Sequence, residues 1–503
     1  MPAAPQDRRW TLIAVCATTF MLLVDITIVN VALPSIQREL DASLTGLQWV
    51  VDAYAITLAA LILTAGALAD RYGRRLIFAI GVALFTVASL LCGVAWNIGS
   101  LDVARALQGV GGAALFATAL ALIGAEYQGR ERAGAIAIWG SVIGVAVASG
   151  PLAGGIITEW LSWRWVFFVN VPIGVAVFVI ALMKVRESRD PRADRTDYAG
   201  LVLFSASLFL IVFGLLRGNG EGWGSGQIVG SLVVGAALLV IFVLVERRQA
   251  RPMLDVSLFR VPAFVGVQLA TFCIGAGMFA LFPFLSIYIQ DILGYSPLKA
   301  GLGFLPFTVF VFAVPLATRN LATTKPMWLL LAVAMALVAV GLVLLEIVSP
   351  TSGYGALLPG FIVAGIGTGL ANPTIAGAAL RVVDPARTGM AAGISNTARI
   401  TGLAVGVAVL GAILQSRIGS SLRDVGFHGS SLSAAVASSG ERAAHGDARL
   451  LGAIPTAFVS GLDTIVLIGA ALLVVGALAA LFLVRRAEAP AAAPEAEPAA
   501  ETS

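Results

Sequence analysis

Long apolar runs alternate with short polar segments along the whole chain of 503 residues. Each run holds roughly 20 mainly apolar residues, which is the length that an α-helix needs to cross the hydrocarbon of a bilayer. The runs are continuous, whereas the strands of a membrane β-barrel alternate apolar with polar positions. The pattern therefore predicts an all-α membrane protein with fourteen transmembrane helices. The predicted spans are Trp10–Leu33, Leu47–Ala69, Leu76–Trp96, Leu101–Gly124, Gly134–Thr158, Trp163–Lys184, Tyr198–Leu216, Gln227–Val245, Pro262–Ile289, Leu298–Thr318, Pro326–Ile347, Tyr354–Leu380, Gly389–Leu414 and Gly461–Val484.

The basic residues are distributed unevenly between the two sides of these spans. With the N-terminus in the cytoplasm, 22 of the 32 Lys and Arg residues lie in cytoplasmic segments and 8 in external ones. This bias follows the positive-inside rule and puts both termini in the cytoplasm. The first run could instead be a signal peptide, but it is too long, contains Asp25 and lacks a cleavage site of small residues. Only three of the basic residues are lysines, which is typical of a GC-rich bacterial genome. We therefore expect a multi-pass protein of the bacterial cytoplasmic membrane.

Composition excludes several classes of protein. Charged residues make up 12% of the chain and apolar residues 59%, too little charge for a soluble protein of this size. The basic residues are scattered, so no nucleic-acid partner is expected. The three cysteines lie in apolar runs, so neither a disulfide framework nor a metal site is indicated, and we expect no cofactor.

Three segments lie outside the predicted spans and differ from them in composition. Residues 1–9 form a short cytoplasmic N-terminus. Residues 415–460 are rich in Ser, Ala and Gly and hold both histidines, which indicates a polar external loop. Residues 485–503 are mostly Ala, Pro and Glu, so we expect a disordered cytoplasmic tail.

A polar motif follows the second predicted span. Residues 66–75 read GALADRYGRR, in which the glycines permit close helix approach and an acid can sit at the N-terminus of a neighbouring helix. An ordinary positively charged loop is the alternative. The segment matches, position for position, a loop of the major facilitator superfamily, which favours a conformational latch. The predicted latch residues are Gly66, Asp70, Arg71, Gly73 and Arg74.

The first span carries a more specific motif. Residues 25–34 read DITIVNVALP, which resembles a signature of the fourteen-span drug:proton antiporter family within that superfamily. The resemblance extends from the first span to the last. It implies the major facilitator fold, with six-helix domains at 10–184 and 262–484 and a two-helix segment inserted at 185–261. Further segments that fit the family are 49–54, 163–174 and 295–301.

The fifth span resembles the motif that separates antiporters from uptake symporters in this superfamily. A Gly-Pro pair bends a helix, and small residues let a partner helix pack closely. Ala146 stands where related sequences usually have glycine, and simple helix packing is the alternative explanation. The predicted antiporter residues are Gly150, Pro151, Gly154 and Gly155.

Three charged side chains lie at least four residues inside the spans, in what we predict to be the outer half of the N-terminal domain. Asp25, Asp52 and Arg105 are expensive to bury, and such residues mark ion or substrate pathways by default. Burial favours a protonated carboxyl and an arginine partner favours an ionised one, so a proton carrier needs both influences. The alternatives are a packing hydrogen bond for Asp25, contact with water for Asp52 and snorkelling for Arg105. We predict that proton and substrate compete for the two carboxylates.

These features predict an exporter of toxic organic compounds or antibiotics that exchanges its cargo for protons and confers resistance. Buried acids favour amphipathic cations as cargo. A proton-coupled uptake symporter for a metabolite is one alternative, and a membrane-embedded enzyme or lipid flippase is another. The sequence shows no nucleophile–base set and no set of metal ligands, and without a P-loop ATP is not expected as the energy source. The expected partners are protons, a small organic substrate and the lipid bilayer, and the protein is expected to act as a monomer. Residues expected to line the substrate cavity are Asn30, Tyr54, Asn396 and Arg399.

Overall fold

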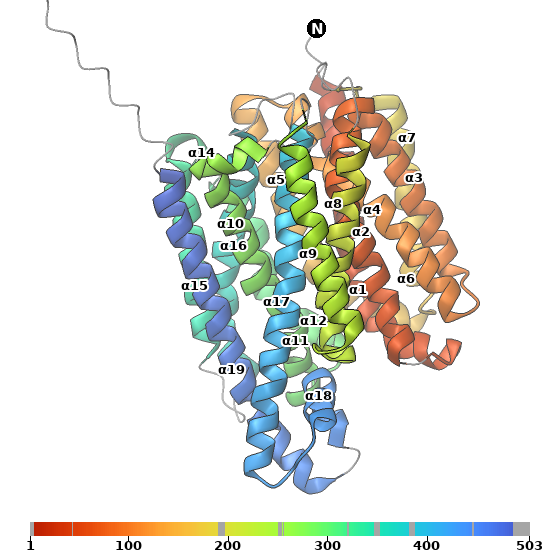
Figure 1. The fold of residues 1–503 in the computed structure, drawn as a ribbon, viewed down its shortest axis with the longest axis vertical. Coiled ribbons are helices and arrows are strands. Elements are labelled where there is room, and N and C mark those ends of the chain that lie inside the picture. Colours follow the sequence, from red (N-terminus) through yellow and green to blue (C-terminus); the bar gives the residue numbers. More distant parts are fainter. Residues whose placement is uncertain are drawn as a thin grey trace, which may run out of the picture.

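A computed structural model describes residues 5–42, 44–189, 197–249, 254, 256–318, 321–346, 353–381, 388–444 and 447–485. Within these ranges every regular element is a helix. The first seven α-helices form the N-terminal half of the bundle, and α8 and α9 follow as a separate hairpin (Figure 1). Their bounds are α1 Pro5–Leu40, α2 Leu44–Tyr72, α3 Arg74–Gly93, α4 Ile98–Glu126, α5 Gly129–Trp160, α6 Trp165–Phe168, α7 Asn170–Lys184, α8 Tyr198–Glu221 and α9 Gly226–Glu246.

The remaining helices form the C-terminal half, in which short helical pieces interrupt several long ones. Their bounds are η1 Val256–Arg260, α10 Pro262–Gly277, η2 Phe279–Leu281, α11 Phe282–Ile287, η3 Tyr288–Ile292, α12 Pro297–Gly303, α13 Leu305–Thr318, α14 Leu321–Thr324, α15 Met327–Leu345, η4 Tyr354–Leu357, α16 Leu358–Arg381, α17 Thr388–Asp424, α18 Ser430–Ser439, η6 Gly440–Ala444, α19 Ala448–Ala479 and η7 Ala480–Val484.

Twelve helical segments in the described part of the chain are long and apolar enough to cross a membrane. The all-α membrane architecture predicted from the sequence is confirmed. The other two predicted spans are Gly134–Thr158 and Leu298–Thr318. In the structure they contain shorter apolar helical stretches, Gly134–Ile143 in α5 and Leu305–Thr318 in α13. The helix α5 is 32 residues long, and a turn at Phe304 separates α12 from α13. The count of fourteen therefore stays a prediction at these two positions.

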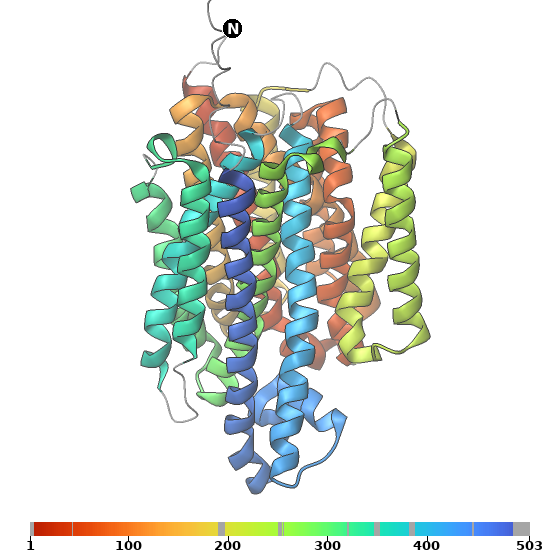
Figure 2. The same ribbon diagram turned by 60° about the vertical axis from the view of Figure 1, so that its left-hand side comes forward.

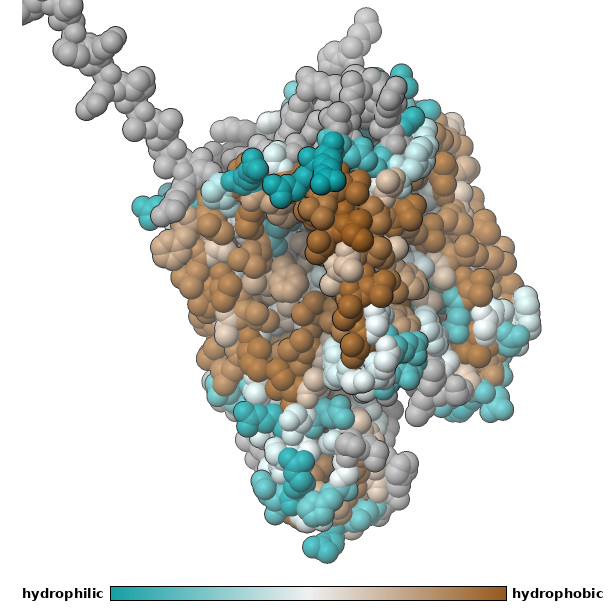
Figure 3. All heavy atoms as spheres, viewed as in Figure 1, coloured by the Kyte–Doolittle hydropathy of each residue, from teal (hydrophilic) through white to brown (hydrophobic). Residues whose placement is uncertain are grey.

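A broad apolar band crosses the surface of the bundle. Figure 3 shows brown, hydrophobic residues across the middle of the visible face, with hydrophilic residues gathered above and below. Large apolar side chains such as Val202, Val233 and Phe482 are more than 60% exposed. A surface of this kind suits acyl chains and not water, as expected for a bundle surrounded by lipid.

The apolar core consists of three clusters, and the one that fills most of the N-terminal half also includes Phe264, Ile394 and Ala404 of the C-terminal half. One cluster of buried side chains draws all its members from residues 263–484, and a second lies wholly within residues 24–167. The halves meet where α5 contacts α12, α13 and α16 and where α17 contacts α2 and α4. The hydroxyl of Ser141 in α5 donates to the carbonyl of Phe312 in α13 at 2.9 Å. The domain boundaries drawn from the sequence are compatible with this division and remain a prediction.

The hairpin of α8 and α9 stands at the edge of the bundle (Figure 2). The helix α8 contacts both α2 of the N-terminal half and α17 of the C-terminal half, while α9 packs on α8. Thr64 of α2 and Ser205 of α8 share a hydrogen bond of 2.8 Å. The hairpin therefore touches both halves through α8.

The segment 415–460 is not the loop that its composition suggested. The helix α17 continues to Asp424, α18 follows, and α19 begins at Ala448. Leu414, Ile418 and Leu422 are at most 2% exposed and continue the apolar stripe of α17 by one residue every turn. These helices project beyond the bundle at the end opposite the N-terminus (Figures 1 and 2). The apolar stripe lies among small and polar residues, which explains why these helices were not predicted, and the external position of the segment stays a prediction.

Close packing of α1 against α5 depends on two glycines of the predicted antiporter motif. A methyl group at Gly150 would lie 2.7 Å from Cβ of Thr27, and one at Gly154 would lie 3.0 Å from the carbonyl oxygen of Ile28. A side chain at Gly150 would therefore force its neighbours to shift, and one at Gly154 would push the backbone of α1 by a few tenths of an ångström. Gly155 is buried in the same helix, and the side chain of Pro151 lies outside the described part.

We expect Gly150→Ala to lower the free energy of unfolding by about 1–3 kcal/mol, the usual cost of overpacking. Gly134 lies in the same helix and has open space where a Cβ would stand. Gly134→Ala should therefore be neutral or stabilising by up to about 1 kcal/mol. Thermal unfolding of the purified variants in detergent measures both, and equal effects would contradict the close α1–α5 contact.

Candidate functional site

An ion pair is completely buried in the N-terminal half. Arg105 of α4 donates from Nη1 to Oδ2 of Asp25 in α1 at 2.5 Å, and the two side chains are 1% and 0% exposed. Arg105 also donates from Nε to the carbonyl of Val50 in α2 at 2.9 Å. The pair is electrically neutral, so each charge is compensated where water cannot reach it. The structure thus brings together two of the three charged residues predicted to form the coupling site.

Three polar side chains complete the network around Asp25. Gln108 donates from Nε2 to Oδ1 of Asp25 at 2.9 Å and accepts from Arg105 at 2.6 Å. Asn170 at the start of α7 donates to the same Oδ1 at 3.1 Å. Ser89 of α3 accepts from Gln108 at 2.8 Å. The network therefore ties α1, α2, α3, α4 and α7 to one carboxylate.

The sequence analysis did not assign a role to Gln108, Asn170 or Ser89. A signal existed for Gln108, because it follows Arg105 by three residues and so lies on the same face of a helix. Asn170 belongs to a motif that pointed to the family but to no particular contact. Nothing in the sequence distinguished Ser89 from any other serine in a span.

Local sequence explains how α4 carries Arg105 to this position. A methyl group at Gly109 would lie 2.5 Å from the carbonyl oxygen of Tyr54, so this glycine lets α4 approach α2. The guanidinium of Arg105 then lies 4.3 Å from the centre of the Tyr54 ring, a cation–π contact. Tyr54, predicted as a cavity residue, is 2% exposed and belongs to the Asp25 network.

Asp52 does not join this network. Its Oδ2 lies 3.9 Å from Nη1 of Arg217, which comes from the inserted helix α8. Arg217 also pairs with Glu221 at 2.7 Å and lies over the ring of Trp49 at 5.3 Å. The third predicted coupling residue therefore connects the N-terminal half to the inserted hairpin.

The other predicted cavity residues lie along the junction of the two halves. Asn396 of α17 donates from its amide nitrogen to the carbonyl of Phe116 in α4 at 3.1 Å. Arg399 lies one turn further along α17 and is partly buried. Asn30 lies in α1, but its side chain is outside the described part of the chain. Asn396 is 1% exposed, and the role of both residues in a substrate cavity stays a prediction.

The predicted latch joins α2 to α3. Asp70 accepts hydrogen bonds from Nε and Nη2 of Arg74 at 3.0 and 2.8 Å, and both side chains are nearly inaccessible. Gly73 between the helices has a φ of +124°, a conformation that other residues rarely adopt. Gly66 is buried in α2, and Arg71 lies in its last turn. The motif thus forms a rigid corner.

Glu187, which the sequence analysis missed, contacts this corner from the segment that follows α7. Its carboxylate accepts hydrogen bonds from the backbone amides of Arg75 and Leu76 at 3.0 and 3.2 Å. The negative charge therefore lies at the N-terminus of α3, where the helix dipole favours it. Glu187 is an acid between two arginines in a polar segment, a pattern that does not identify a helix cap.

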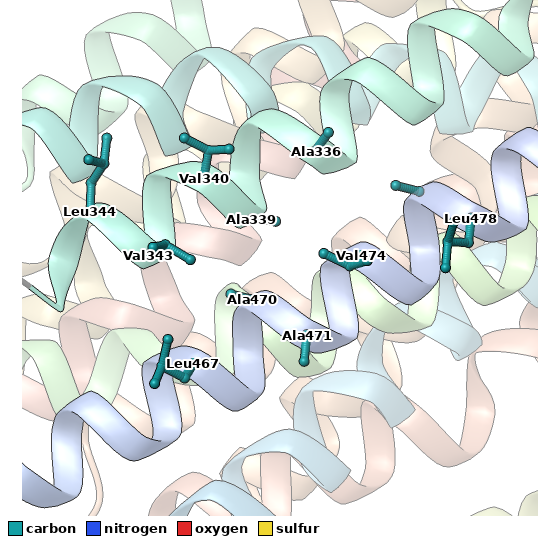
Figure 4. Close-up of a pocket in the computed structure, with 11 residues that line it drawn as sticks. Ala336, Ala339, Val340, Val343, Leu344, Leu467, Ala470, Ala471, Val474 and Leu478 are labelled. Carbon is teal, nitrogen blue, oxygen red and sulfur yellow. The ribbon is translucent and has the colours of Figure 1, made fainter.

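A groove on the surface of the C-terminal half contrasts with these polar sites. It has a volume of about 500 Å³ and lies between α15 and α19 (Figure 4). Its lining consists only of alanine, valine and leucine side chains. The groove offers no group that could select a polar cargo.

Comparison with known proteins assigns the family. The sequence model of the family described as "Major Facilitator Superfamily" matches residues 15–407 of this chain. The chain belongs to the major facilitator superfamily. This membership confirms the resemblance drawn from the motifs and makes the protein a membrane transporter, not an enzyme.

Several characterised transporters are similar over most of their length. The puromycin resistance protein pur8 of Streptomyces alboniger is 39% identical over 440 residues, covering 86% of each chain. The tetracenomycin C resistance and export protein of Streptomyces glaucescens is 33% identical and covers 97% of this chain and 94% of its own. The multidrug resistance protein Stp of Mycobacterium tuberculosis is 36% identical, over 82% and 77% of the two chains.

A solved structure supports the same fold. The human organic anion transporter MFSD10 (TETRAN) superimposes with a TM-score of 0.61 over 94% of this chain and 100% of its own. At 12% sequence identity, the similarity concerns the arrangement of helices alone.

Removing one partner of the buried Asp25–Arg105 pair should strongly destabilise the protein. We expect Asp25→Asn and Arg105→Gln each to lower the free energy of unfolding by about 3–5 kcal/mol, because each leaves a buried polar network with an uncompensated or missing charge. The double variant should recover part of this loss. Thermal unfolding in detergent measures it, with Arg8→Gln as the control, because the exposed pair of Arg8 with Glu131 should contribute at most about 1 kcal/mol. Additive losses in the double variant would contradict the pairing.

Glu187→Ala should lower the free energy of unfolding by about 1–2 kcal/mol, because two backbone amides of α3 lose their acceptor. Glu159 is exposed at the end of α5, so Glu159→Ala should change the stability by less than about 0.5 kcal/mol. The same unfolding measurement compares them. If the two variants unfolded alike, Glu187 would have no capping role.

Proposed function

We propose that this protein exports toxic organic compounds, antibiotics among them, across a bacterial cytoplasmic membrane in exchange for protons, and so confers resistance. It acts as a monomer with both termini in the cytoplasm. Its two six-helix domains, at 10–184 and 262–484, move relative to each other around the inserted segment. The observation that carries the proposal is the buried network of Asp25 and Arg105.

The network supports proton coupling through its charge balance. An ionised Asp25 neutralises Arg105, so protonation of the carboxylate leaves a buried guanidinium without a counter-charge. The protonated state therefore favours an arrangement of helices in which Arg105 finds water or another partner. Because Asp25 holds α1, α4 and α7 together through hydrogen bonds, its protonation changes contacts among all three. Proton binding is thereby coupled to a conformational change.

The direction of transport is supported by the relatives and by the fifth helix. Proteins of similar sequence are named for resistance to puromycin, for resistance to and export of tetracenomycin C, and for export of cephamycin. The close contact of α5 with α1 at Gly150 lies within the motif that resembles that of antiporters. The metabolite symporter considered from the sequence has no such support.

Export should depend on the proton gradient and on Asp25. In cells loaded with a fluorescent drug, we expect a protonophore to stop export and Asp25→Asn to abolish it per molecule of folded protein. Asp447→Asn is the matched control, because Asp447 caps α19 through backbone amides and asparagine caps equally well. Gradient-driven export by Asp25→Asn at the level of the unaltered protein would refute the coupling role.

A further inference from the structure

Arg399 differs from Arg105 and Arg217 because, in the part of the chain that the structure describes, it forms no ion pair. Arg105 pairs with Asp25, and Arg217 pairs with Asp52. Among the described residues, no carboxylate forms an ion pair with Arg399, and its Nε is buried without a hydrogen-bond partner. An uncompensated guanidinium at membrane depth is expensive. Arg399 therefore has a binding capacity that the described part of the chain does not fill.

The geometry of α17 places Arg399 between the halves. Methyl groups at Gly402 and Gly406 would contact Phe272 and Ala276, so this face of α17 packs on α10. Asn396 marks another face, which contacts α4. At 100° per residue, Arg399 lies between these two faces. Its side chain therefore begins where the C-terminal half meets the N-terminal half.

Gln268 of α10 is level with this turn of α17. The contacts of Gly402 with Phe272 and of Gly406 with Ala276 show that α10 and α17 run in the same direction. Gln268 lies one turn before Phe272 on α10, and the turn from Ser395 to Arg399 lies before Gly402 on α17. Gln268 is 6% exposed, and neither its amide oxygen nor its amide nitrogen has a hydrogen-bond partner among the described residues. The hydroxyl of Ser395 is likewise buried and unpartnered. Unpartnered polar groups of α10 and α17 therefore lie along the same packed helix pair as this positive charge.

The helix α16 extends the same unpartnered polar surface. Thr368 and Asn372 are 0% exposed, and the side-chain polar atoms of both lack partners among the described residues. The helix α16 contacts both α10 and α17, and Asn372 lies opposite Gly140 of α5. Each unsatisfied buried group costs about 1–3 kcal/mol. Water can satisfy the amides and hydroxyls, but it cannot neutralise the guanidinium.

We propose that Arg399, together with Gln268 and Ser395, binds an anionic oxygen group of the cargo, such as a carboxylate or an acidic enol or phenol. A guanidinium offers a fork of donors that matches two oxygens of such a group. Both intramembrane acids predicted to attract cations are already paired with arginines. This inference rests on the proposed export function and replaces the expected amphipathic cation with an acidic amphiphile.

Three ligands with one aromatic body test the assignment: 2-naphthoate, 2-naphthamide and 2-naphthylmethylammonium. Equilibrium dialysis against the purified full-length protein in detergent measures their binding. We expect naphthoate to bind about tenfold more tightly than the ammonium compound, a difference of about 1.4 kcal/mol. Arg399→Gln should abolish this preference, whereas Arg399→Lys keeps the charge and should retain most of it.

Gln268→Leu provides a variant that should fold well, because it removes an unsatisfied buried amide without changing the volume greatly. It should weaken naphthoate binding about threefold while leaving thermal stability unchanged or raised. Equal binding of the three ligands, binding of none of them, or a preference that survives in Arg399→Gln would overturn the assignment. Gradient-dependent drug efflux is measured separately, so its loss with the ligand preference intact would reject the export proposal alone.

Discussion

A carboxylate and a guanidinium that are both sealed from water must compensate each other, and the N-terminal half is organised around this requirement. The Asp25–Arg105 pair is 0% and 1% exposed. Its remaining hydrogen-bonding capacity is satisfied by Gln108, Asn170 and a backbone carbonyl of α2. Because these groups come from different helices, the electrostatic constraint also fixes the relative positions of the helices. The same constraint makes the protonation of a single carboxylate a structural event.

The bilayer made most of the fold predictable, because its thickness imposes a length and a composition on every span. Contacts between spans are not encoded in that pattern. Arg217 lies one residue beyond the predicted span Tyr198–Leu216, so its pairing with Asp52 could not be foreseen until α8 was seen to continue to Glu221. The helices of segment 415–460 were not predicted for a different reason, because small and polar residues separate the apolar residues that pack α17.

The candidate site was predictable to the same extent. The free-energy cost of burying a charge within a span was enough to identify Asp25 and Arg105 as functional candidates. The neutral members of the network carry no such cost, and Ser89 resembles any serine in a helix. Glu187 was missed because its role depends on the fold bringing the end of α7 to the start of α3. Sequence therefore identifies the charges of a site more readily than the groups that position them.

The polar contacts within the Asp25 network are stronger than the polar contacts between the two halves. Breaking the buried pair costs about 3–5 kcal/mol, whereas a neutral hydrogen bond contributes about 1 kcal/mol. The polar contacts between the halves include two neutral hydrogen bonds, from Ser141 to the carbonyl of Phe312 and from Asn396 to the carbonyl of Phe116. Apolar packing of α5 and α17 also joins the halves, so the polar contacts across the junction are only part of what holds it closed. The Asp25 carboxylate is 0% exposed and all its partners among the described residues come from the N-terminal half, so its network does not depend on the junction between the halves.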